Sequence, residues 1–321
     1  MMPIMKAGEE ISWSKNYMRI ILMLCTICNF SCSYCFTARS RIDKKKYISA
    51  DVLKSLFTKL ASLNKEKYFF ILSGGEPLLY PHLELLFDLL ENQFYVENKL
   101  IINTNGYFLN KTQAFSTLKK TKFTLSVSAH LEQMAVTEYE KILKNTVYKE
   151  NILVSIKIIP GELDKAKRLR SFCEKNNFLY SIAALQLNGE LHRQYSTEEI
   201  DYINSNASDE EKIFFNVFND EQRRKVHFSK LDTLHDPNLV QYKGMYCSAG
   251  FSSLRVDTEE RISRCMTDAR NDFSMAVLEN LVSCPTICTA ERCRCMAMYR
   301  LPKWRDPADA PEYLRRTAGD L

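Results

Sequence analysis

The chain has 321 residues and a mass of 37.3 kDa, which predicts one large domain or a core domain with a small appendage. Its 45% hydrophobic and 26% charged residues are typical of a globular protein, and a net charge of +5 is too weak to indicate a nucleic-acid or membrane partner. No apolar run reaches the ~18 residues of a membrane span. Met1–Ser14 also lacks the features of a signal peptide, so we expect a cytoplasmic protein.

From Arg19 to Gln186, short strand-like runs alternate with longer amphipathic runs. The predicted strands are Arg19–Leu24, Lys67–Leu72, Lys99–Asn103, Lys122–Val127, Ile152–Ile159 and Phe178–Leu185. The predicted helices are Ala50–Leu63, with Ser49 and Asp51 as capping residues, His82–Asn92, Lys111–Lys119, Glu138–Lys144 and Glu162–Lys175. About six such units fall short of the eight of a closed barrel. We therefore predict an α/β fold, a partial (β/α)6 TIM-type barrel, with a doubly wound sheet as the alternative.

The alternation ends near residue 187, and the composition then changes. An acidic stretch at residues 208–211 precedes a basic one at residues 223–225, and six cysteines follow between residues 247 and 295. Ser196–Asn204 is predicted to be helical. We predict five regions: an N-terminal extension (1–17), the partial barrel (18–187), a linker or insertion (188–241), a small cysteine-rich hairpin domain (242–300) and a tail (301–321).

The eleven cysteines are the unusual feature of the composition. Without a secretory signal, disulfides explain them poorly, because the cytosol keeps thiols reduced. Clustered cysteines in such a protein are typical of metal ligands or catalytic groups.

Three of the cysteines, Cys28, Cys32 and Cys35, follow directly after the first predicted strand. Zinc in structural sites and iron–sulfur clusters normally take four protein ligands, so three thiolates leave one metal position open. Cys25 is predicted to lie buried within the strand rather than to complete the site. The second strand ends in Ser73–Pro77, with the sequence Ser-Gly-Gly-Glu-Pro, whose glycines let the backbone approach a ligand. Because strand carboxyl ends form the ligand face of such barrels, we expect both loops to lie side by side.

Together, in this order, the two motifs resemble those of the radical S-adenosylmethionine (SAM) enzymes. The resemblance covers roughly Arg19–Gln186. It implies a [4Fe–4S] cluster held by Cys28, Cys32 and Cys35, with SAM on the open iron and reductive cleavage to a 5′-deoxyadenosyl radical that removes a hydrogen from the substrate. The alternative is a zinc loop on an ordinary α/β domain.

The same resemblance implies SAM contacts at the strand ends, from Tyr34, Gly74, Gly75, Glu76, Thr104, Ser128 and Lys157. Tyr34 corresponds to the family residue near the adenine, and the Gly-Gly-Glu segment to backbone contacts with the methionine amino group. His130 replaces the usual Asp after the fourth strand. Lys157 is expected to meet the SAM carboxylate or a substrate anion, or else to face solvent.

The C-terminal cysteines resemble the twitch type of auxiliary-cluster domain, the shortened relative of the SPASM domain. Cys247 opens the region and Cys265 closes a predicted hairpin, in which Glu260 stands where the family usually has Gly. The resemblance implies one auxiliary [4Fe–4S] cluster, with zinc as the alternative. Its ligands would be Cys247, Cys265 and others from Cys288, Cys293 and Cys295, while Cys173 and Cys284 are expected to stay unligated.

The favoured function is a radical SAM oxidoreductase that acts on a peptide or natural product. The alternatives are a sugar or aminocyclitol dehydrogenase or epimerase, a viperin-like nucleotide-modifying enzyme, and a non-enzymatic iron–sulfur or zinc scaffold. The intact Gly-Gly-Glu-Pro disfavours the scaffold, and the C-terminal cysteines disfavour the viperin-like enzyme. Only about eighteen residues precede the first strand, so we expect no fused leader-peptide-binding domain.

The expected partners are a small-molecule or peptide substrate and an external electron donor of the flavodoxin or ferredoxin type, with no nucleic acid and no membrane. Cys25, Tyr34 and His130 are candidates for the catalytic acid, base or hydrogen donor, and the pattern does not choose between them.

Overall fold

The protein is represented by a computed structural model, which describes residues 17–35, 46–63, 67–94, 99–187, 190–191, 195–206, 242–265, 278, 286–290 and 303–305. Of the cysteines singled out in the sequence, Cys284, Cys293 and Cys295 lie outside these residues. Most of the predicted linker and tail, and almost all of the N-terminal extension, also lie outside them.

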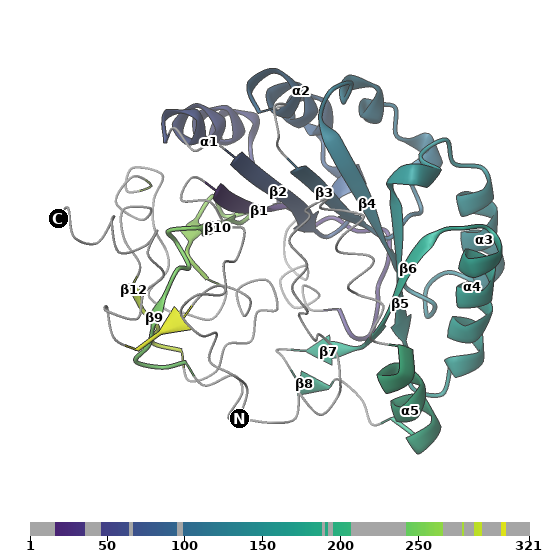
Figure 1. The fold of residues 1–321 in the computed structure, drawn as a ribbon. Coiled ribbons are helices and arrows are strands. Elements are labelled where there is room, and N and C mark those ends of the chain that lie inside the picture. Colours follow the sequence, from purple (N-terminus) through teal and green to yellow (C-terminus); the bar gives the residue numbers. More distant parts are fainter. Residues whose placement is uncertain are drawn as a thin grey trace.

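The described residues contain the predicted succession of parallel strands and covering helices (Figure 1). The strands are β1 (Tyr17–Cys25), β2 (Lys67–Gly74), β3 (Lys99–Thr104), β4 (Lys122–Ala129), β5 (Ile152–Ile158) and β6 (Leu179–Ala184). The helices are α1 (Ala50–Ser62), α2 (Leu83–Gln93), α3 (Val136–Lys144) and α4 (Leu163–Lys175). Neighbouring strands follow the chain order and pair in parallel, which confirms the predicted α/β fold of partial-barrel type.

Side chains alternate across the sheet between an apolar and a polar face. In β5, the even-numbered residues from Ile152 to Ile158 are buried in the main core, while Ser155 between them is only partly buried. Ser155 lies opposite Ser128 of β4 and Ser181 of β6 in the strand register. The helices cover the apolar face in Figure 1. The concave face therefore carries small polar side chains that leave room for a ligand.

Helix α1 begins where the sequence predicts. The Ser49 hydroxyl accepts a hydrogen bond from the Val52 N–H (3.4 Å), and Asp51 lies in the first turn. Its buried residues recur at helical spacing and pack under the sheet: Leu53, Leu56, Phe57 and Leu60.

One predicted helix is wrong. Within residues 111–119 the structure has only short 3₁₀ turns, η3 (Leu109–Lys111) and η4 (Ala114–Thr117). The Thr112 hydroxyl donates to the Phe108 carbonyl and the Ser116 hydroxyl to the Gln113 carbonyl, so both hydroxyls take carbonyls that a continuous helix would use. Beyond the turns, the Glu91 carboxylate accepts backbone N–H bonds from residues 119, 120 and 121, which holds this segment in a loop.

The C-terminal part returns to the same sheet. Strand β10 (Ser253–Val256) pairs in parallel with β1, and β11 (Ile262–Ser263) pairs antiparallel with β10. The sheet order is β11-β10-β1-β2-β3-β4-β5-β6, with β11 and β6 at its edges, so among the described residues the barrel stays open. The predicted hairpin thus extends the barrel's own sheet.

Several short elements complete the described chain. They are η2 (Pro77–Leu79), η5 (Lys149–Asn151), β7 (Gln186–Leu187), β8 (Glu190–Leu191), α5 (Thr197–Asn206), β9 (Tyr246–Cys247), β12 (Thr286–Ile287) and β13 (Lys303–Trp304). β9 pairs with both β12 and β13. Helix α5 confirms the predicted helix at Ser196–Asn204 within about two residues. None of the described helices is long and apolar enough to cross a membrane.

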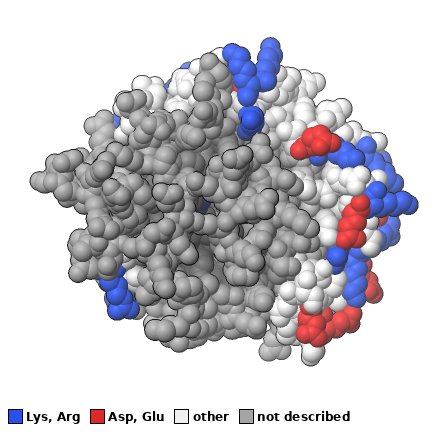
Figure 2. Space-filling model, in the orientation of Figure 1, with Lys and Arg blue, Asp and Glu red and all other residues white. Residues whose placement is uncertain are grey.

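The described surface mixes charges of both signs. Figure 2 shows Lys and Arg interspersed with Asp and Glu on the side formed by α3, α4 and α5. Arg168 pairs there with Glu140 (3.1 Å), and Lys167 with Glu198 (2.7 Å). This alternation agrees with the small net charge of the sequence.

Candidate functional site

The cysteine loop, residues 26–35, follows the carboxyl end of β1. Cys32 is 8% exposed, whereas Cys28 and Cys35 are half-buried, and the Cys35 N–H donates to the Cys32 carbonyl (3.1 Å) in a tight turn. Burial, followed by the neighbouring Cys35 thiol, raises the pKa of Cys32 to about 12. A neutral thiol is therefore favoured here until a positive group arrives, and bound metal stabilises thiolates in this way.

The donor set of this loop fits an iron–sulfur cluster, because its three cysteines are soft ligands of the kind that hold such clusters. Soft ligands also disfavour Mg²⁺ or Ca²⁺.

The glycine loop, residues 74–77, hydrogen-bonds directly to the cysteine loop. The Gly75 N–H donates to the Cys25 carbonyl (2.6 Å), and the Glu76 N–H donates to the Ile27 carbonyl (2.7 Å). A Cβ on Gly75 would lie 2.1 Å from the Ile27 oxygen, and one on Gly74 would lie 2.5 Å from the Cys25 oxygen. Gly74 also has a φ of +133°, in the region that favours glycine. The two glycines are therefore required for the two loops to approach.

The side chain of Glu76 holds the glycine loop in place through buried hydrogen bonds. Its side chain is fully buried and accepts hydrogen bonds from the Leu78 N–H (3.0 Å), the Thr104 hydroxyl (2.7 Å) and the Asn105 N–H (2.7 Å). Burial raises the pKa of this carboxyl, and the three donors oppose that rise. The Thr104 hydroxyl also accepts from the Gly106 N–H (3.0 Å). Thr104, predicted as a SAM contact, thus uses its hydroxyl to join the ends of β2 and β3.

Asn105 links this third strand end to the cysteines, and the set of site residues predicted from the sequence does not include it. Its side-chain amide donates to the Asn29 side chain (2.8 Å) and approaches the Cys28 sulfur (3.9 Å). The Asn-Thr-Asn-Gly sequence at the end of β3 was the available signal. It identifies a polar turn but does not say which side chain reaches the sulfur.

The fourth and fifth strands contribute the remaining predicted contacts. Ser128 and Lys157 are partly buried at alternate positions that face the concave side of β4 and β5. Tyr34 reaches this side as well, because its hydroxyl lies 3.0 Å from His130 Nδ1 and the two rings stack at 5.8 Å. The predicted SAM contacts thus surround one end of the concave face, although their roles stay predictions.

Cys25 is a buried partner of the same loops. Its thiol donates to the Glu76 carbonyl (3.4 Å), and burial raises its pKa to about 11. These contacts agree with an inert thiol within β1, as predicted.

Three of the C-terminal cysteines also gather against the concave face. Cys247 is buried with Ile21 of β1 and Ala249, and Cys265 and Cys288 pack against this group. Cys284, Cys293 and Cys295 lie outside the described residues. Ile21 and Cys247, which are more than two hundred positions apart in the sequence, thus pack together beside β1.

Unpartnered donors lie on the same face. Within the described part of the chain, the Nε of Arg255 and the hydroxyls of Ser253 and Ser263 are buried without a hydrogen-bond partner. Arg255 of β10 lies opposite Ile21 of β1 on one side and opposite Ser263 of β11 on the other. The Asp257 carboxylate lies 4.0 Å from Arg255 Nη1 and makes a closer contact, of 2.9 Å, to Arg261. Orphaned buried donors are typical of a site that receives an anionic group.

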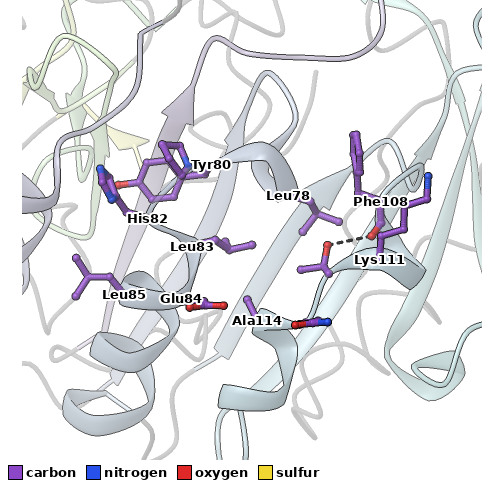
Figure 3. A pocket seen from close by; sticks show the side chains of 12 residues that line it. Leu78, Tyr80, His82, Leu83, Glu84, Leu85, Phe108, Lys111 and Ala114 are labelled. Atoms are coloured by element: carbon purple, nitrogen blue, oxygen red, sulfur yellow. Dashed lines mark hydrogen bonds between the residues drawn. The ribbon is translucent and has the colours of Figure 1, made fainter.

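A surface pocket of about 590 Å³ lies apart from both cysteine groups (Figure 3). It runs from Tyr80 and His82 at the start of α2 to Phe108 and Lys111. None of its lining residues is a cysteine or a predicted SAM contact. We therefore place the candidate site at the strand ends and not in this pocket.

Comparisons with known proteins fall on the region that carries both motifs. The sequence model of the Radical SAM superfamily matches residues 22–164. A GTP 3′,8-cyclase of Mannheimia succiniciproducens is 24% identical over 165 residues, which are 44% of this chain and 48% of that protein. The match therefore spans about half the length of that relative.

Solved structures share the fold at low identity. anSMEcpe with bound AdoMet and the Kp18Cys peptide is 15% identical, with a TM-score of 0.54, over 94% of this chain and 95% of that chain. SuiB of Streptococcus suis, bound to precursor peptide SuiA, is 15% identical, with a TM-score of 0.50, over 88% of this chain and 65% of that chain. Residues 22–164 of the chain are therefore a radical SAM domain.

Proposed function

We propose that this protein is a radical SAM oxidoreductase that modifies a peptide or peptide-like natural product. The observation that carries the SAM chemistry is the direct hydrogen bonding between the cysteine loop and the glycine loop, with Gly75 N–H 2.6 Å from the Cys25 carbonyl. A zinc loop on an ordinary α/β domain has no need of a glycine pair packed against it.

Cys28, Cys32 and Cys35 would hold the [4Fe–4S] cluster. When bound, that cluster would supply one electron to cleave the sulfonium of SAM into methionine and a 5′-deoxyadenosyl radical, which would remove a substrate hydrogen. Gly74 and Gly75 leave backbone atoms accessible for the amino group of SAM. The wall formed by the barrel keeps water away from the reacting atoms.

The concave polar residues orient the rest of SAM and the substrate. Lys157 provides a positive charge on β5 for a carboxylate, and Ser128 provides a hydroxyl on β4. Tyr34 is held against His130 at the mouth of this face, where the adenine would lie. An external flavodoxin- or ferredoxin-type protein would donate the electron.

A peptide substrate is supported by two relatives of the same fold. anSMEcpe and SuiB are each solved with a bound peptide, although their 15% identity relates only the folds. The GTP 3′,8-cyclase match covers about half of either chain, so it does not carry the nucleotide substrate over. A sugar or aminocyclitol substrate is the alternative, and the substrate experiment below distinguishes it.

We also propose an auxiliary [4Fe–4S] cluster at the C-terminal cysteines. Cys247, Cys265 and Cys288 gather in one apolar group, and a fourth ligand would come from Cys293 or Cys295. The buried Arg255 Nε, which has no hydrogen-bond partner among the described residues, fits this cluster because a cluster with four thiolates carries negative charge. With all four irons ligated by protein, electron transfer is favoured over direct substrate binding.

Anaerobic reconstitution with iron, sulfide and dithionite tests both proposals. We expect about eight irons per chain, from two four-iron clusters, and release of 5′-deoxyadenosine from SAM. The triple variant Cys28→Ala/Cys32→Ala/Cys35→Ala should lose about four irons and all SAM cleavage. Cys173→Ala, a buried cysteine of α4, is the matched control and should keep both. Metal binding without SAM cleavage in the parent chain would refute the proposed activity.

Deuterated substrates test the substrate class. We expect deuterium transfer into 5′-deoxyadenosine from a deuterated peptide and none from deuterated sugars or aminocyclitols. Transfer from a sugar alone would overturn the peptide proposal and leave the SAM chemistry standing.

A further inference from the structure

The turn that follows β4 reaches back to the cysteine loop. Residues 130–133 form a tight turn in which the N–H groups of Gln133 and Met134 donate to the His130 carbonyl, at 2.9 and 3.1 Å. The Gln133 side-chain oxygen accepts from the Ser31 N–H (3.0 Å). Three strands, β2, β3 and β4, separate the partners in the sequence, so the contact is purely tertiary.

A second contact lies two residues further along the same loop. The Glu132 carboxylate accepts from the Ser33 N–H at 2.9 Å. Cys32 lies between Ser31 and Ser33, so the backbone N–H groups of both residues next to this cysteine are held by one turn. A hydrogen bond to a charged acceptor is among the stronger ones in proteins.

A third contact holds Tyr34. His130 Nδ1 lies 3.0 Å from the Tyr34 hydroxyl, and the rings stack at 5.8 Å with an interplanar angle of 21°. The backbone of His130 is itself held, because the His130 backbone N–H donates to the hydroxyl of the fully buried Tyr139 (2.8 Å). The edge of Phe30 also packs against the His130 ring. The histidine is therefore fixed by the core before it contacts the loop.

We propose that residues 130–133, the β4 clamp, are positioning residues that preorganise Cys32 for the cluster. The inference rests on the proposed function, because it takes Cys32 as a cluster ligand. Holding the N–H groups of both neighbouring residues restricts the backbone around Cys32 before metal binds, so less backbone entropy is lost on binding.

Amide hydrogen exchange in the cluster-free 321-residue chain tests the contacts themselves. In Gln133→Ala we expect exchange at Ser31 to rise about tenfold, and in Glu132→Ala the same rise at Ser33, since each loses its acceptor. Glu138→Ala is the control, because Glu138 is an exposed carboxylate in the first turn of α3. Unchanged exchange at both serines in the two variants would overturn the clamp, whether or not the protein cleaves SAM.

Cluster assembly tests the positioning role. We expect the double variant Glu132→Ala/Gln133→Ala to alkylate Cys32 severalfold faster without metal. After reconstitution it should retain less iron and give broader electron paramagnetic resonance signals than Glu138→Ala. Faster serine exchange with unchanged iron retention and unchanged spectra would show that the contacts exist but do not position the cysteine. Absence of SAM cleavage in the parent chain, with the iron and spectral effects intact, would instead count against the proposed function alone.

Discussion

The two cysteine regions are built in different ways. Cys28, Cys32 and Cys35 lie on one short loop that is held by three other strand ends, through Gly75, Asn105 and the β4 clamp. Cys247, Cys265 and Cys288 lie in β9, after the β10–β11 hairpin and after β12, and they pack beside Ile21 of β1, which pairs with β10. The first site is therefore local in sequence, whereas the second requires the chain to close back on its own first strand.

The largest expected effect separates the two regions by function. Cys32→Ala should reduce SAM cleavage to background, because it removes a ligand of the proposed SAM-binding cluster. Cys247→Ala should lower the iron content from about eight to about four while SAM cleavage without substrate continues. Iron analysis and 5′-deoxyadenosine release measure both outcomes. Equal loss of cleavage in the two variants would mean that the regions do not act separately.

A glycine substitution tests how tightly the first loop is packed. In Gly75→Ala the new Cβ would lie 2.1 Å from the Ile27 oxygen, so the cysteine loop must move and we expect SAM affinity to fall at least about tenfold. Gly161→Ala is the control, because nothing lies within 4 Å of its new Cβ although φ is +81°. It should cost about 1 kcal/mol of folding stability and leave SAM binding unchanged. Equilibrium dialysis and urea unfolding check the pair, and unaltered SAM binding in Gly75→Ala would contradict the packing argument.

Glu76→Gln tests the carboxylate that joins the ends of β2 and β3. The neutral amide keeps one acceptor oxygen for the donors from Leu78, Thr104 and Asn105, so we expect a loss of about 1–3 kcal/mol in the free energy of unfolding.

The same variant has a defined pH dependence. Burial raises the pKa of Glu76 above its ordinary value of 4.5. The contribution of Glu76 to the free energy of unfolding is therefore full below pH 4.5 and is lost as pH rises through the raised pKa. The difference in the free energy of unfolding between the parent protein and Glu76→Gln should therefore be largest at low pH and shrink as pH increases. Chemical unfolding at several pH values measures it, and a difference that grows with pH would reverse the assigned sign.

The smallest expected effect concerns the hairpin of the second region. Glu260 has a φ of +63°, a conformation that glycine adopts without strain, and its carboxylate accepts from the Ser49 hydroxyl (2.8 Å). Glu260→Gly removes the strain but also the contact with the cap of α1, so we expect the free energy of unfolding to change by less than about 1 kcal/mol. A loss of several kcal/mol on thermal or urea unfolding would mean that the second region depends on this one contact.

Much of the first region could be predicted from the sequence because its signals are local. The six strands and four of the five predicted helices of the barrel follow from periodicity, and Ser49 marks the start of α1. The helix predicted at residues 111–119 failed, because hydroxyls and the distant Glu91 capture the backbone groups that a helix needs. That capture depends on a residue of another helix and has no local signal.

By itself, the sequence determined the order of the strands, the position of the two motifs after β1 and β2, and the need for glycine where the two loops touch. Only the tertiary structure decided that Asn105 approaches Cys28, that Glu132 and Gln133 hold the N–H groups of the residues next to Cys32, and that β10 completes the sheet beside β1. The physical reason is the range of the interactions. Periodicity and turn chemistry act within a few residues, whereas these contacts join segments 77 or more positions apart, and only the folded sheet brings them together.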